Sequence, residues 1–235
     1  MKKRYLKIVL IAMCSFSIVG CGKTGSNEMK QSKDVATADS VVNDDFEYDT
    51  SDIDGENYMI STYSGTTDDV IIPDKYRDKQ VVEIGDHAFS NTRAQIKKVQ
   101  LGSNVQVIEE HAFSSNADLK DVVLNEGLKY IEKFAFLNSG LTGTMVIPDS
   151  VETIGTSAFG LTKIENVEFG KNIKKIAGGA FSGNTNLKRA IFNNMDVKFE
   201  DETVFGECPN LTIVAPKGST AEKYAKDNNI KFEER

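Results

Sequence analysis

The apolar residues of the chain repeat a short phrase, in which an isoleucine is followed by three variable residues and then by Ala-Phe. Successive phenylalanines of this phrase are 24, 23, 23, 22 and 24 residues apart. This spacing predicts a chain built from structural repeats that stack on one another. The copies occupy residues 84–89, 108–113, 131–136, 154–159 and 176–181, and a sixth, imperfect copy ends at Phe205.

A run of β-branched and other apolar residues lies between successive copies of the phrase. Each repeat therefore predicts one β-rich rung followed by a turn. A single rung cannot bury its apolar face alone, whereas stacked rungs share parallel-strand hydrogen bonds at about 4.8 Å spacing and enclose a common core. Alignment on the phenylalanines places these runs at 96–101, 119–124, 144–147, 164–169 and 187–192.

The repeat length falls within the range of about 20 to 29 residues that is typical of leucine-rich repeats. The sequence therefore predicts a leucine-rich-repeat solenoid, a right-handed β/α superhelix of mostly short parallel strands with short or helical turns, and about six repeats over residues 84–214. Its isoleucines and phenylalanines should point inward, and its alanines are small enough for adjacent turns to approach closely. In the sixth copy Glu200 takes the isoleucine position and Phe199 stands one residue early, so the register there is open.

The phrases I-G-D-H-A-F, I-E-E-H-A-F and I-G-T-S-A-F, with V-I-I-P-D and M-V-I-P-D upstream, resemble the BspA-like leucine-rich-repeat family. The resemblance extends over about residues 58–232 and includes a closing segment, A-P-K-G-S-T-A-E-K-Y-A. There Ser219 and Glu222 predict a capping box that starts a short helix to about Asp227, followed by a strand at 230–232, as a C-terminal helix-strand cap. The family resemblance implies adhesion to host proteins or interaction with other surface components.

The N-terminal residues predict export. A basic start at residues 1–7 precedes an apolar stretch at 8–19 and then Gly20-Cys21, as in a secretion signal over residues 1–20. The sequence I-V-G-C resembles a bacterial lipobox, which implies cleavage before Cys21 and attachment of diacylglycerol to its thiol. The protein would then be exported and lipid-anchored in the bacterial cell envelope. The alternative is a plain signal peptide with an incidental cysteine.

The segment after the signal is polar and small in its side chains. We interpret residues 21–45 as the lipidated cysteine and a disordered tether, because the segment cannot bury enough apolar surface to offset the entropy of ordering. The folded domain is expected at 46–235. Removal of the signal leaves 24 basic against 35 acidic residues, a net charge of -11, since four basic and no acidic residues leave with it. This charge argues against a nucleic-acid partner.

Little in the sequence indicates catalysis, and no cofactor is expected. His87 and His111 are the two histidines, one repeat apart, and with Asp86 and Glu110 they could form a metal cluster. The alternative, which we favour, is that both are solvated residues of a variable position. Later repeats place other residues there, namely Phe134, Ser157 and Gly179. We therefore predict neither a catalytic nor a metal site, although the many carboxylates leave an exported hydrolase as a remote alternative.

The cysteines indicate no disulfide framework. Cys14 leaves with the signal and Cys21 carries lipid, so Cys208 has no partner in an exported chain. Cys208 aligns with Asn116 and Asn184 of earlier repeats, which predicts a structural position and not a reactive thiol.

A binding surface is predicted on the strands that precede the turns. In each strand the two residues flanking the middle apolar residue point away from the core. One resulting row is polar and of mixed charge, and the other carries three exposed aliphatic residues, which could also simply reflect β propensity. The paired positions are Lys98 and Gln100, Asp121 and Val123, Thr144 and Val146, Asn166 and Glu168, and Arg189 and Ile191.

We therefore expect a non-catalytic surface lipoprotein that binds an extracellular protein or another surface macromolecule and contacts the membrane through its lipid anchor. The alternative is a structural spacer or assembly element of the cell envelope.

Overall fold

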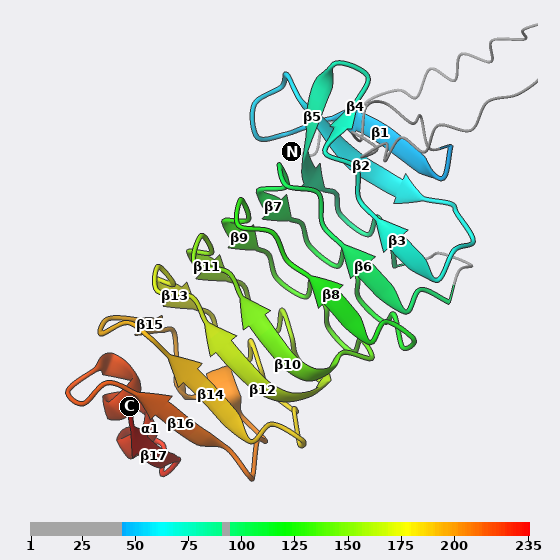
Figure 1. Cartoon of the computed structure of the whole chain (residues 1–235). Helices are drawn as coiled ribbons and strands as arrows, with labels where there is room; N and C mark the ends of the chain where they lie inside the picture. The colour runs from blue at the N-terminus through cyan, green and yellow to red at the C-terminus, as the bar shows by residue number, and fades with distance from the viewer. Residues whose placement is uncertain (1–43, 91–94) are drawn as a thin grey trace, which may run out of the picture. The chain divides into compact units, whose positions relative to one another are not determined.

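The computed structural model of the protein describes residues 44–90 and 95–235. These residues form a β-solenoid of about eight turns, made mostly of parallel strands, with one α-helix near the C-terminal end (Figure 1). The predicted repeat solenoid is thereby confirmed. The predicted signal peptide, Cys21 and nearly all of the predicted tether fall within residues 1–43, which lie outside the described ranges.

The short strands that end at the isoleucines of the repeated phrase, one in each turn, belong to a nine-stranded sheet. Its strand order is β1-β2-β5-β7-β9-β11-β13-β15, with β4 paired to β5. β1 and β4 pair antiparallel with their neighbours, and the other strands pair parallel. Their bounds are Phe46–Thr50 (β1), Tyr58–Tyr63 (β2), Lys75–Tyr76 (β4), Lys79–Ile84 (β5), Val107–Ile108 (β7), Tyr130–Ile131 (β9), Thr153–Ile154 (β11), Lys175–Ile176 (β13) and Lys198–Phe199 (β15).

The register of this sheet aligns the isoleucines of the repeated phrase from turn to turn, beginning with Ile84 opposite Ile108. At the last turn Ile176 pairs with Phe199. Phe199, and not Glu200, therefore occupies the isoleucine position of the sixth copy. The aromatic ring takes the place of the aliphatic side chain and packs, partly buried, against the core, while Glu200 lies on the surface and pairs with Lys175 at 2.8 Å.

The other strands of the repeats form two parallel sheets, β3-β6-β8 and β10-β12-β14-β16-β17, which Figure 1 shows side by side. Between β8 and β10 the ladder is interrupted, and the Thr142 amide donates to the Lys120 carbonyl at 3.2 Å. The bounds are Asp69–Ile71 (β3), Lys98–Gln100 (β6), Asp121–Val123 (β8), Thr142–Ile147 (β10), Lys163–Phe169 (β12), Arg189–Phe192 (β14), Thr212–Ala215 (β16) and Lys231–Glu234 (β17).

The phenylalanines of the phrase stack into a column along the solenoid axis. Neighbouring ring centroids from Phe89 to Phe205 lie 4.6 to 5.5 Å apart, and the rings are buried. The isoleucines beside them are buried as well. Burial of each such side chain contributes about 1.5 to 3 kcal/mol, so the column is a large part of the force that holds the turns together.

The alanine of the phrase lies where the backbones of adjacent turns approach closely and form hydrogen bonds. The Phe113 amide donates to the Ala135 carbonyl of the next turn at 2.7 Å, and the Phe136 amide donates to the Ala158 carbonyl at the same distance. These bonds make a further ladder beside the two strand series. Because the backbones approach this closely, a side chain larger than alanine would push adjacent turns apart.

The solenoid begins one turn before the first copy of the phrase. Ile60 in β2 pairs with Ile84, and the Tyr63 ring stacks on Phe89 with centroids 5.1 Å apart. Phe46 in β1 also packs on Tyr63, at 5.2 Å. The N-terminal turn and hairpin therefore cap the phenylalanine column with aromatic rings, although this turn lacks the Ala-Phe sequence that marks the later ones.

The C-terminal cap contains a 3-10 helix, η1 (Glu202–Phe205), an α-helix, α1 (Thr220–Asp227), and β17. The Ser219 hydroxyl accepts from the Glu222 amide at 3.2 Å, as predicted, but the Glu222 carboxylate accepts from the Gly218 amide and not from that of Ser219. Tyr224 of α1 covers Phe205 and stacks on Phe199.

The cap closes the core but does not remove the sheet edge. β17 pairs parallel with β16 alone among the described strands, so the sheet is extended by one strand and ends at β17. The backbone of β17 therefore leaves an open edge of its own, because a parallel strand that adds to a sheet edge creates another.

Candidate binding face

The ten residues predicted to point outward lie on the outer surface of β6, β8, β10, β12 and β14, and none is buried. Between each pair the middle residue of the strand is buried, as Val99 and Val167 are. Within each of the two sheets the strand register lines the outward residues into two rows, and the alignment of the repeats continues these rows from β8 to β10. The polar row contains Asp69, Lys98, Asp121, Thr144, Asn166 and Arg189, and the aliphatic row contains Ile71, Gln100, Val123, Val146, Glu168 and Ile191. Val214 of β16 continues the aliphatic row in register, but it is buried.

Most members of the polar row pair with one another or with the cap. The Lys98 ammonium lies 3.3 Å from the Asp121 carboxylate, and the Asn166 amide donates to the Thr144 hydroxyl at 3.2 Å. The Arg189 guanidinium makes two hydrogen bonds to Glu233 of β17, at 3.0 and 3.1 Å. These hydrogen bonds raise the pKa of Arg189 and lower that of Glu233.

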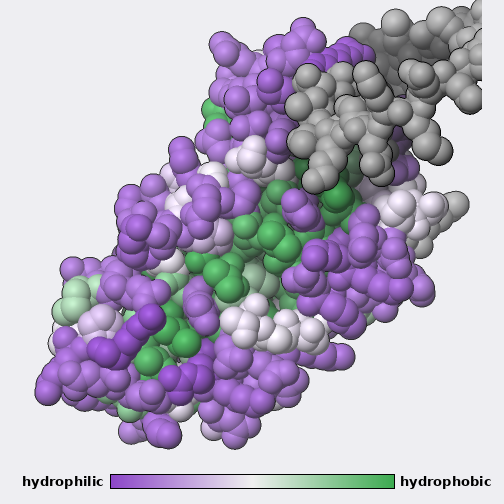
Figure 2. Space-filling view, in the orientation of Figure 1, coloured by the Kyte–Doolittle hydropathy of each residue, from purple (hydrophilic) through white to green (hydrophobic). Residues whose placement is uncertain are grey.

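The aliphatic row exposes apolar side chains to solvent. Ile71 is 68% exposed, Val146 59% and Val123 42%. Figure 2 shows hydrophobic residues gathered along this face between hydrophilic margins. Ile71 was missed by the sequence analysis because β3 precedes the first copy of the phrase, although the pattern V-I-I-P-D around it marks the same strand as M-V-I-P-D.

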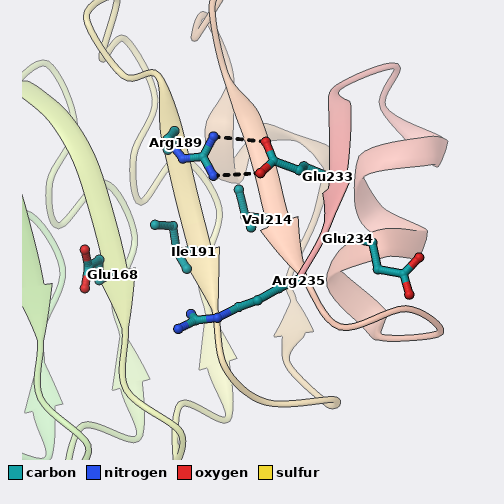
Figure 3. Close-up of a pocket in the computed structure, with 7 residues that line it drawn as sticks. All are labelled: Glu168, Arg189, Ile191, Val214, Glu233, Glu234 and Arg235. Carbon is teal, nitrogen blue, oxygen red and sulfur yellow. Dashed lines mark hydrogen bonds and ion pairs between the residues drawn. The ribbon is translucent and has the colours of Figure 1, made fainter.

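At the C-terminal end of this face the two rows enclose a shallow pocket of about 260 Å³ (Figure 3). Ile191 contributes most of its apolar surface, and Val214, which also lines the pocket, is buried. The pair formed by Arg189 and Glu233 lies beside them, and the Arg235 side chain extends from the end of β17 back over the sheet. The pocket is lined by Glu168, Arg189, Ile191, Val214, Glu233, Glu234 and Arg235.

The two histidines stack, with ring centroids 4.7 Å apart, and His111 stacks in turn on Phe134 at 4.9 Å. All three have positive φ values of 57° to 61°, a conformation that costs side-chain-bearing residues about 1 to 2 kcal/mol each. In the next two turns Ser157 and Gly179 occupy the equivalent position, and both also have positive φ. Among the described residues no group of three or more His, Cys, Asp or Glu side chains is placed to hold a metal ion.

Cys208 lies where asparagines lie in other turns. The Asn184 side chain donates to the carbonyls of Phe159 and Phe181, at 2.9 and 2.8 Å, and the Cys208 thiol donates to the Phe181 carbonyl at 3.3 Å. Burial raises the pKa of the Cys208 thiol to about 11. The thiol is therefore protonated at neutral pH and holds a turn together.

A cluster of glutamates near the N-terminal cap was not foreseen. Glu83 is buried, and its carboxylate accepts from the Ser51 hydroxyl at 2.6 Å and the Asp52 amide at 3.1 Å. Burial, together with the carboxylates of Glu83 and Glu132, raises the pKa of Glu109 to about 7. Each of these residues comes from a different turn, so only the three-dimensional register brings them together.

Within residues 44–90 and 95–235, no helix has the length and hydropathy needed to span a membrane.

Stacked turns of 22 to 24 residues with an outward sheet face define the protein as a leucine-rich-repeat solenoid. The profile of the BspA type leucine rich repeat region matches residues 82–212 in six copies. This match spans more than half of the chain, and the chain belongs to that family. No curated protein matches the sequence.

Two solved structures show the same architecture. A leucine-rich repeat protein of T. pallidum, TpLRR, is 25% identical, with a TM-score of 0.56, and the match covers 80% of this chain and 95% of that one. The pneumococcal vaccine antigen PcpA is 17% identical, with a TM-score of 0.62, over 75% of this chain and 44% of that one. The chain thus matches less than half of the PcpA chain, and that likeness concerns the fold alone.

Proposed function

We propose that the protein is a non-catalytic surface lipoprotein, exported and anchored through Cys21, whose aliphatic row binds another protein outside the cell. Membership of a leucine-rich-repeat family supports a binding role, because such solenoids present extended surfaces to partners. The ligand, on this proposal, lies across several strands at once.

The observation that carries the proposal is the contrast between the two rows. Side chains of the polar row pair with one another or with the cap, whereas Val123 and Val146 of the aliphatic row are exposed, as is Ile71 on the far side of Gln100. Contiguous exposed apolar side chains rimmed by polar residues are typical of protein-protein contact sites.

The proposal is tested on a protein array that displays extracellular-matrix and bacterial surface proteins. Binding of the wild-type protein to the array is compared with binding of a double variant, Val123→Asp with Val146→Asp. Binding to the recognised protein should fall at least about tenfold, since two buried apolar contacts would be replaced by unpaired charges. The matched control is Leu161→Asp with Met195→Asp, because these residues are 56% and 47% exposed in loops between the strands. Equal loss in both double variants would contradict the proposal.

The lipid anchor is tested at the cysteines of the signal region. Cys21→Ser should move the exported protein from the membrane fraction to the soluble fraction and remove the diacylglycerol mass from its N-terminal peptide. Cys14→Ser, inside the predicted signal, should change neither. A wild-type protein whose mature N-terminal peptide carries no diacylglycerol would show that the cysteine is incidental.

We favour binding over a structural assembly role because of the charges at the free strand edge. β17 carries Lys231, Glu233 and Glu234, and charged side chains on an edge strand oppose edge-to-edge pairing. An assembly element should self-associate with increasing concentration and without a ligand, which sedimentation velocity would detect.

A further inference from the structure

The pocket at the C-terminal end of the binding face combines an apolar surface with charged side chains, some of which are paired within the protein and some of which are not. Ile191 and Val214 are neighbours in the aliphatic row and lie in register on β14 and β16. Glu168 lies in the same row on β12, opposite Ile191. A ligand in the pocket would therefore meet aliphatic carbon first and a carboxylate at one margin (Figure 3).

Most charges around the pocket are already neutralised within the protein. Arg189 is held by Glu233, and Glu234 lies 3.9 Å from the Lys217 ammonium. Glu168 is exposed and makes neither an ion pair nor a side-chain hydrogen bond with any residue that the structure describes, and the same holds for Arg235. Glu168 is therefore the one acidic side chain of the pocket without a charged partner among those residues.

From this geometry we infer that the pocket binds a basic side chain of the protein partner, whose aliphatic stem lies on Ile191, beside the buried Val214, while its charged end meets the Glu168 carboxylate. Lysine and arginine bury their methylene stems on apolar surface and keep the charge at its edge. The inference rests on the proposed function and adds the chemistry of one contact to it.

Arg235 gives the pocket a polarity. Its side chain runs over the sheet from the end of β17 and adds a positive charge at another margin of the pocket (Figure 3). A second cation on the ligand is disfavoured there, whereas a carboxylate near the basic residue is favoured. The best ligand is thus a segment with a single basic residue and no second cation beside it.

The test uses blocked tripeptides as probes, titrated into the purified full chain at low salt and followed by NMR. Val-Lys-Val should bind about threefold to fivefold more tightly than Val-norleucine-Val, which keeps the stem and lacks the charge, and Val-Glu-Val should bind most weakly. High salt should remove the difference between lysine and norleucine.

Glu168→Lys should reverse the preference between the lysine and glutamate peptides. Glu126→Lys is the matched control, because it makes the same change of charge at an exposed turn residue and should leave the preference unchanged. Equal binding of the lysine and norleucine peptides overturns the inference, as does an equal effect of both variants. Self-association that Glu168→Lys abolishes would make a second copy the occupant and also overturn it.

The two proposals can fail separately. If the double aspartate variant of Val123 and Val146 still abolishes protein binding while the three peptides bind equally, the pocket inference is wrong and the binding face stands. If neither variant set affects protein binding, the face itself is wrong.

Discussion

The inside of the solenoid repeats itself, and the outward face does not. Along the core the same two side chains recur, an isoleucine in the strand and a phenylalanine in the column, with rings stacked at nearly constant distance. On the outward face, residues at equivalent positions change from lysine to aspartate or from valine to glutamate. The difference teaches that the repeated residues specify architecture, whereas recognition depends on the residues that vary.

The largest expected effect comes from removing a ring from the column. Phe136→Ala should lower the free energy of unfolding by about 3 to 5 kcal/mol, because it leaves a cavity in the fully buried core. Phe134→Ala is the control within the same turn, since this ring is only half-buried and stacks on His111, and it should cost about 1 kcal/mol. Denaturant unfolding measures both, and equal losses would contradict the division between core and surface.

A smaller effect is expected where the turns approach through their backbones. Ala135→Leu should cost about 1 to 3 kcal/mol, because the larger side chain separates the turns joined by the Phe113 amide and the Ala135 carbonyl. Hydrogen exchange should then accelerate at the Phe113 amide. A leucine tolerated without loss of stability would show that close approach is not what selects alanine.

The glutamate cluster predicts a pH dependence of smaller size. Because the folded-state pKa of Glu109 is about 7 and its ordinary value is 4.5, the folded chain holds a proton that the unfolded chain releases between these values. Stability should therefore fall as the pH rises through this range, by about 1 kcal/mol after allowance for the solvent screening of a half-buried group.

Glu109→Gln should remove most of that decline, whereas Glu126→Gln, at an exposed turn, should preserve it. Chemical unfolding from about pH 5 to about pH 8 makes the comparison. A decline of the same size in the Glu109→Gln protein would place the responsible group elsewhere.

The period of the phrase was enough to predict the solenoid, the buried isoleucines and phenylalanines, and the outward strand positions, because these depend on local pattern. It could not predict contacts between distant residues. Arg189 and Glu233 are 44 positions apart and meet only because β17 adds to the sheet. Glu83 and Glu109 similarly meet through the turn register, and Phe199 replaces isoleucine where the phrase is imperfect.

The pairing of Arg189 also changes how the face should be probed. A charge reversal at Arg189 would place a glutamate beside Glu233 and disturb the cap, so it tests structure and recognition together. Glu168, which lies in the same face without a partner in the described chain, is the cleaner position for a charge reversal.

The most direct test of the account measures stability and affinity together in the double variant Val123→Asp with Val146→Asp. Both residues are exposed, so the free energy of unfolding should stay within about 0.5 kcal/mol per substitution of the wild-type value, while affinity for the protein partner found on the array falls at least about tenfold. Unchanged affinity in a fully folded variant would contradict the account.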